Sequence, residues 1–243
     1  MKKVFCIWMT AVMVCAMIPS AAFAAPSSEA VIDEVKAEQD IAKALVQALE
    51  EYADQSEEIQ MMPIGNGAEY CRQVYELKSG DELIMEFTDC KEDETALSPM
   101  QHIPAVMPTA ANGETVWKDY GNRYFTAKAT VTTAAGSGWV SLENHYTLSA
   151  NGIDERYGVA DCDGAVGSTS RLSIDTLGVY ITDSAARTVG TSDVNMYAEY
   201  YVKSLFANHG TLEKKVQLET KIGYTAHNKT TKQIQVKHSW SLK

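Results

Sequence analysis

Residues 212–242 read LEKKVQLETKIGYTAHNKTTKQIQVKHSWSL, in which apolar and polar side chains alternate on both sides of a polar turn at residues 227–230. Alternation with a period of two, with one apolar and one charged face, is typical of an antiparallel hairpin packed on one side only. Such a hairpin is not stable alone, because its apolar face needs a second layer. We therefore expect the preceding segments to supply that layer. The predicted apolar face consists of Val216, Leu218, Ile222, Tyr224, Ile234, Val236, Trp240 and Leu242.

Several segments before this hairpin show the same alternation and are separated by turn sequences such as Asn151-Gly152, a strong hairpin signal. With the terminal hairpin they make about seven strands and show no helical pattern. This predicts a mainly β fold, an antiparallel immunoglobulin-like β-sandwich over residues 115–243. The pattern does not determine the strand order, and a barrel is the alternative. The predicted strands before the hairpin cover residues 123–133, 139–149, 153–159, 171–182 and 193–206.

Three segments come before the predicted sandwich. Residues 25–62 carry apolar side chains at spacings of three and four among many acidic ones, which predicts an acidic amphipathic α-helix. This helix could pack on its own domain or on a partner helix. Residues 63–91 predict a β-hairpin that turns at residues 79–82. Residues 92–114 contain three prolines and no periodicity, which predicts a linker or a long surface loop.

The first residues predict export. Lys2 and Lys3 precede an apolar run over residues 4–18 and the small-residue sequence Ala22-Phe23-Ala24. This pattern is typical of a secretory signal peptide, here residues 1–24, and an uncleaved membrane anchor is the alternative. We expect a secreted protein, extracellular or associated with the cell surface, with no membrane insertion after cleavage.

The charge is unevenly distributed along the chain. The formal net charge is −11, and removing Lys2 and Lys3 makes it −13. Residues 26–112 carry 19 acidic and 5 basic side chains, whereas residues 113–243 carry 13 acidic and 14 basic ones. Phosphate backbones would be repelled by the first part and attracted only weakly by the second. Nucleic acids are therefore poor candidates as partners.

Three cysteines remain after the predicted signal peptide, an odd number for an oxidising compartment. If Lys78 faces Leu83 in the hairpin, Cys71 faces Cys90 within bridging reach, which predicts a disulfide between them. Cys162 could replace one of these partners, or form an intermolecular disulfide if it is exposed.

A search for catalytic motifs finds no nucleophile elbow, no His-Glu-x-x-His, no phosphate-binding glycine loop and no Cys-x-x-Cys. The segment Asp161-Cys162-Asp163 begins like a calcium loop, but its ligands stop after two carboxylates, so a polar turn is the better interpretation. We therefore expect no cofactor and no metal.

Four aromatic side chains lie in the outward register of the predicted strands: Tyr124, Trp139, Tyr197 and Tyr201. Outward aromatic rings on a flat sheet could stack on a sugar ring or dock a partner. The alternative is that the N-terminal helix or hairpin covers them.

The chain resembles small secreted bacterial all-β proteins, a resemblance of architecture that carries over no functional residues. We expect a non-catalytic binding or interaction protein, whose partner is a protein or a cell-surface polysaccharide. The alternative is an extracellular glycosidase-like hydrolase built from dispersed residues such as Glu143, His145, Asp161 and Asp163.

Overall fold

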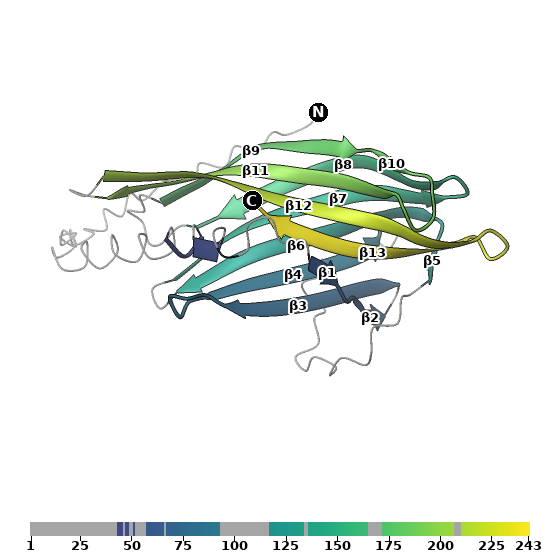
Figure 1. Cartoon of the computed structure of the whole chain (residues 1–243), viewed down its shortest axis with the longest axis horizontal. Helices are drawn as coiled ribbons and strands as arrows, with labels where there is room; N and C mark the ends of the chain where they lie inside the picture. The colour runs from purple at the N-terminus through teal and green to yellow at the C-terminus, as the bar shows by residue number, and fades with distance from the viewer. Residues whose placement is uncertain are drawn as a thin grey trace, which may run out of the picture.

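The computed structural model shows two stacked antiparallel sheets (Figure 1). It describes residues 43–45, 47–48, 51, 57–65, 67–92, 117–133, 136–164, 172–206 and 210–243. Within these residues the protein is mainly β, as predicted, and no helix there is long and apolar enough to cross a membrane.

The first sheet has the order β1-β13-β12-β11-β9, with β5 also paired to β13. We call it the six-stranded sheet. Its strands are β1 (Glu57–Ile59), β5 (Trp117–Asp119), β9 (Leu172–Asp183), β11 (Asp193–Phe206), β12 (Gly210–Asn228) and β13 (Gln233–Leu242).

The second sheet has the order β10-β8-β7-β6-β4-β3-β2, and we call it the seven-stranded sheet. Its strands are β2 (Met62–Gly65), β3 (Ala68–Glu76), β4 (Glu82–Lys91), β6 (Gly121–Thr133), β7 (Gly136–Ser149), β8 (Gly152–Asp163) and β10 (Ala185–Ala186).

Strands that are neighbours in a sheet mostly follow one another along the chain, as in a meander. An immunoglobulin-like sandwich instead needs Greek-key connections, in which a fourth strand returns beside the first. The antiparallel two-layer part of the prediction is confirmed, whereas its immunoglobulin-like part is not. Besides the seven strands predicted for the sandwich and the two of the first hairpin, the described residues contain four short strands, β1, β2, β5 and β10, which are too brief to show alternation.

The terminal hairpin is confirmed. Strands β12 and β13 pair with Leu218 opposite Leu242 and Ile222 opposite His238, and the eight side chains of the predicted apolar face are all buried. The inward faces of both sheets form one continuous core. Its fully buried members include Phe87, Phe125, Val131, Leu142, Val194, Met196, Ala198, Tyr200, Leu218 and Ile234.

The predicted N-terminal helix is described only at residues 43–45, 47–48 and 51, which are helical. Ala44, Leu45 and Ala48 pack into the core at one end of the sandwich, and Glu51 Oε1 accepts a hydrogen bond from the Lys78 amide at 3.1 Å. Figure 1 shows this segment beside the β3–β4 turn. These residues therefore pack on their own domain.

The end of the predicted helix is wrong. Residues 57–59 and 62–65 form strands, because β1 pairs with the edge of β13 and β2 pairs with β3. The unpaired backbone groups of a sheet edge favour a strand, and this tertiary pairing overrides the helical pattern. The predicted signal peptide lies outside the described residues, as does the linker beyond residue 92.

The first hairpin has a different register from the predicted one. Glu69 lies opposite Asp89 and Cys71 lies opposite Phe87, a shift of three residues from the predicted pairing. Directly opposite residues point to the same face of a sheet, so Cys71 shares a face with Phe87. Cys90 lies three residues after Phe87 on β4, and side chains alternate between faces along a strand, so Cys71 and Cys90 project to opposite faces. Both are free and buried, so the predicted disulfide is wrong. Cys162 is free and only partly buried, and its intermolecular disulfide stays a prediction.

The three thiols should differ in reactivity. Burial raises the pKa of Cys71 to about 11 and also raises that of Cys90, so both should resist alkylation in the folded protein. Burial also raises the pKa of Cys162, but this residue is more exposed than the other two, and its Sγ lies 3.0 Å from the Ile174 carbonyl oxygen. We expect Cys162 to react first, and the other two only after unfolding in guanidinium, as measured by mass spectrometry of alkylated peptides. A peptide containing a Cys71–Cys90 cross-link in the non-reduced protein would contradict this register.

Candidate functional site

A cluster of charged side chains lies between the two sheets, with Asp89 at its centre. Asp89 Oδ1 accepts a hydrogen bond from Arg123 Nε at 2.7 Å, and Oδ2 accepts from Lys118 Nζ at 2.7 Å and from the Tyr146 hydroxyl at 2.5 Å. His238 Nε2 also lies 2.7 Å from Oδ2. Asp89 is fully buried and none of the other four is more than 5% exposed. We call these residues, together with Glu69, the Asp89 cluster.

The cluster joins the two sheets. Asp89, Arg123 and Tyr146 come from the seven-stranded sheet, whereas Lys118 lies on β5 and His238 on β13 of the other sheet. The Lys118 ammonium group also pairs with the buried Glu69 carboxylate of β3. The two carboxylates and two cations balance, which is the condition under which buried charges are tolerated.

The surroundings of the cluster determine the protonation states of Asp89 and His238. Burial alone would raise the pKa of Asp89, but the Lys118 and Arg123 cations outweigh it and hold this pKa well below 3.8. Burial lowers the pKa of His238, and the Asp89 carboxylate only partly opposes this. The imidazole is therefore neutral and Asp89 ionised at neutral pH. A carboxylate so firmly ionised is a poor proton acceptor, so the cluster suits holding charge better than general-base chemistry.

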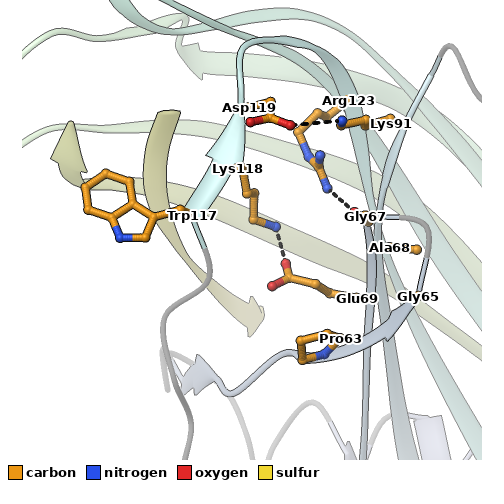
Figure 2. A pocket seen from close by; sticks show the side chains of 10 residues that line it. All are labelled: Pro63, Gly65, Gly67, Ala68, Glu69, Lys91, Trp117, Lys118, Asp119 and Arg123. Carbon is orange, nitrogen blue, oxygen red and sulfur yellow. Dashed lines mark hydrogen bonds and ion pairs between the residues drawn. The ribbon is translucent and has the colours of Figure 1, made fainter. Parts of the chain in front are cut away.

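A pocket of about 130 Å³ borders one side of this cluster, where Glu69, Lys118 and Arg123 line it. Figure 2 shows Lys118 reaching from β5 toward Glu69, and the Lys91–Asp119 ion pair, 3.3 Å long, nearby. Trp117, which is 40% exposed, also lines the pocket. The remaining lining residues are Pro63, Gly65, Gly67, Ala68 and Arg123.

The sequence patterns contained a signal for this cluster. Arg123 lies two residues before Phe125 and Asp89 two residues after Phe87, so both charged side chains occupy the apolar register of their strands. A charge in that register is buried unless the strand ends or bulges, and therefore needs a partner. The partners could not be identified, because Lys118 and His238 come from the other sheet.

A second arrangement lies on the outer face of the seven-stranded sheet. Tyr124 of β6 lies opposite His145 of β7, which lies opposite Tyr157 of β8. The Tyr157 ring stacks on the His145 ring with centroids 4.1 Å apart and is 46% exposed, whereas the Tyr124 ring is 5.9 Å from that of His145. These three residues form a row of rings across three adjacent strands, which we call the aromatic row.

His145, the central residue of the aromatic row, contacts two carboxylates. His145 Nδ1 lies 2.6 Å from Glu92 and Nε2 lies 2.6 Å from Glu143. Arg156 also pairs with Glu92 at 2.5 Å, and its guanidinium lies 5.3 Å from the Tyr157 ring centroid.

Of the four predicted contact residues, the structure brings two to this face. Trp139 lies on the same outward side of β7 as His145, with Lys128 Nζ 4.1 Å from its ring centroid. Tyr197 and Tyr201 lie on β11, on the outer face of the opposite sheet. Tyr197 stacks there on Tyr180 with centroids 5.0 Å apart. The four predicted residues therefore form two separate groups.

The four residues suggested for the alternative hydrolase function lie on two adjacent strands. Glu143 and His145 lie on β7 and Asp161 and Asp163 on β8, where Asp161 pairs with Ser141 and Glu143 with Val159. Glu143 and Asp161 are therefore diagonal neighbours, with backbones about 7–8 Å apart. All four belong to the outer sheet face and none lines the pocket near Lys118.

One further carboxylate, Glu155 of β8, is partly buried. Glu155 Oε1 accepts a hydrogen bond from Asn144 Nδ2 at 2.7 Å, while Glu155 Oε2 and Asn144 Oδ1 are buried without a hydrogen-bond partner among the described residues. Burial raises the pKa of Glu155 to about 8, and the Asn144 hydrogen bond opposes this only in part. Glu155 is therefore mainly a neutral acid at pH 7.

Comparison with known proteins gives no name to either site. No protein-family model matches the chain, and no curated protein or solved structure is similar to it. Its function is therefore inferred from its own residues.

Proposed function

We propose that the protein is a secreted, non-catalytic binding protein that holds an extended cell-surface polysaccharide on the outer face of the seven-stranded sheet. The observation that carries this proposal is the aromatic row of Tyr124, His145 and Tyr157, with Trp139 on the same face. Aromatic rings present a flat apolar surface that stacks on the apolar face of a sugar ring.

The spacing along the sheet favours a long ligand over a single sugar. Trp139 and His145 lie six residues apart on β7, which corresponds to about 20 Å of extended strand. Between them the outward side chains include Ser141, Glu143 and Thr126, which offer hydroxyl and carboxylate groups for hydrogen bonds. A ligand that touches both ends of this stretch must itself be extended.

The charges on this face favour an uncharged polymer. The carboxylates of Glu92, Glu143, Asp161 and Asp163 outnumber the cations Lys128 and Arg156 on these strands. Like charges facing one another across an interface reduce binding, so polyanions are disfavoured. This agrees with the acidic composition of the whole chain.

Two alanine variants test the proposal, with a third on the opposite face as the matched control. We expect Tyr157→Ala and Trp139→Ala each to weaken binding roughly tenfold, because a lost stacking contact is worth about 0.5–1.5 kcal/mol beyond buried area. Tyr197→Ala, which also removes a stacked outward ring, should bind as the wild type does. Binding is measured by pull-down on purified cell-wall polysaccharide and on an array of neutral and acidic glycans.

The outcomes separate the alternatives. Equal binding by all three variants would overturn the proposed face, and loss in Tyr197→Ala alone would move the site to the other sheet. Binding of a protein but of no glycan would overturn the polysaccharide. Release of reducing ends by the wild type, abolished in Glu143→Gln, would instead establish the hydrolase.

A further inference from the structure

Three side chains with metal-ligand chemistry converge inside the Asp89 cluster. Glu69 of β3, Asp89 of β4 and His238 of β13 each offer one ligating atom, and these atoms all lie within 4.8 Å of one another. The three residues are 5%, 0% and 2% exposed. Strands from two sheets therefore bring one nitrogen and two oxygen donors to a single buried point.

The imidazole of His238 supplies an independent observation. Neither of its ring nitrogens makes a well-oriented hydrogen bond to a described residue, although Nε2 lies 2.7 Å from Asp89 Oδ2. Buried polar atoms nearly always have a hydrogen-bond partner. A buried imidazole that faces carboxylates without a good hydrogen bond is suited to donating its lone pair to a cation.

The ammonium group of Lys118 already occupies the space between these carboxylates. Lys118 Nζ pairs with both Glu69 and Asp89, 2.7 Å from Oδ2 of the latter. Lys118 lies on β5, a strand of three residues held by its pairing with β13. Figure 2 shows Lys118 pointing from β5 toward Glu69, and both residues line the pocket.

We propose that Glu69, Asp89 and His238 form a binding site for a divalent transition-metal ion of the Zn²⁺ class, which Lys118 closes as a tethered, competing cation. One imidazole and two carboxylates are a donor set that Zn²⁺ accepts, with a fourth position left for water. Reaching metal–ligand distances of about 2.0–2.2 Å requires small shifts of the side chains. Arg123, hydrogen-bonded to the other oxygen of Asp89, orients this carboxylate.

The charge balance predicts how the two cations compete. With Lys118 and Arg123 in place, both carboxylates are neutralised, so a metal ion enters only when Lys118 leaves. The wild type should therefore bind Zn²⁺ weakly, and removing the ammonium group should strengthen binding. A metal bound by the wild type should also release β5 from the cluster.

Titration with ZnCl₂ followed by calorimetry and by the unfolding temperature tests this competition. We expect Lys118→Gln to bind Zn²⁺ at least tenfold more tightly than the wild type, and His238→Gln to remove binding in both backgrounds. Lys91→Gln is the matched control, because this lysine lines the same pocket but pairs with Asp119 instead of the three ligands. It should bind as the wild type does.

Three results would each overturn the proposal. A folded Lys118→Gln protein that binds Zn²⁺ no more tightly than the wild type would exclude the competition, and binding that survives His238→Gln would place the ion elsewhere. If Lys118→Gln fails to fold, hydrogen exchange of the wild type decides the matter. Saturating Zn²⁺ should speed amide exchange in residues 117–119, whereas unchanged exchange there would also exclude the proposal.

Discussion

Replacing Asp89 with asparagine is expected to lower the free energy of unfolding by about 3–5 kcal/mol, because it leaves two buried cations with one carboxylate. Asp89 accepts hydrogen bonds from Arg123, Lys118 and Tyr146 at the same time. An amide has the same shape but no charge, and its NH₂ group would face donors. We expect the unfolding temperature to fall by roughly 10 °C or more, as measured by circular dichroism.

The loss of stability caused by Asp89→Asn should become smaller as the pH falls. The folded-state pKa of Asp89 lies well below 3.8, so its ionised form contributes stability in full above that value. The contribution is lost as the pH falls toward the folded-state pKa. The difference between wild type and Asp89→Asn should therefore be constant between pH 6 and 8 and narrow below about pH 4. Asp161→Asn, an exposed residue on β8, is the control and should change stability by less than about 0.5 kcal/mol.

Replacing Glu155 with glutamine is expected to stabilise the protein at alkaline pH. Its folded-state pKa, about 8, is higher than the ordinary value of 4.5, so the folded protein keeps a proton that the unfolded chain releases. Wild-type stability therefore falls as the pH rises from 4.5 to about 8 and then levels off. Each pH unit contributes at most ~1.4 kcal/mol, and partial exposure reduces this.

The measurement is denaturant unfolding of wild type and variant at pH 5 and pH 9. We expect the free energy of unfolding of Glu155→Gln, relative to that of the wild type, to be about 2–4 kcal/mol higher at pH 9 than at pH 5. The Asn144 side chain can still donate a hydrogen bond to the glutamine oxygen, so the contact seen in the structure is kept. Glu82→Gln, the same substitution at an exposed position on β4, is the control and should change stability by less than about 0.5 kcal/mol. A variant that is equally stable relative to wild type at pH 5 and pH 9 would show that Glu155 titrates normally.

The two binding proposals concern different places in the fold and can fail separately. The aromatic row lies on the outer face of the seven-stranded sheet, whereas the three metal-ligand residues lie between the sheets. Tyr157→Ala leaves the Asp89 cluster intact, and Lys118→Gln leaves the aromatic row intact. Each set of variants is therefore a folding control for the other.

Alternation along the chain was sufficient to locate the terminal hairpin and most longer strands. It worked because a side chain on a strand packed on one side is either buried or exposed, and residues such as Val216 and Leu218 record this directly. The same parity identified Tyr124 and Trp139 as outward residues. Alternation shows which side chains point outward, but it does not show to which of the two sheets a strand belongs. It therefore could not predict that Tyr197 and Tyr201 lie on the opposite outer face of the sandwich from Tyr124 and Trp139.

By itself, the sequence determined the mainly β class, the faces of the strands and the position of the terminal turn, since these depend on neighbours along the chain. The tertiary structure alone decided the register of Cys71 against Phe87, the strand at residues 57–59 and the contacts of Lys118 and His238 with Asp89. Each of these depends on pairing between segments distant in the chain. Such pairing is governed by backbone hydrogen bonds and charge compensation that no local pattern encodes.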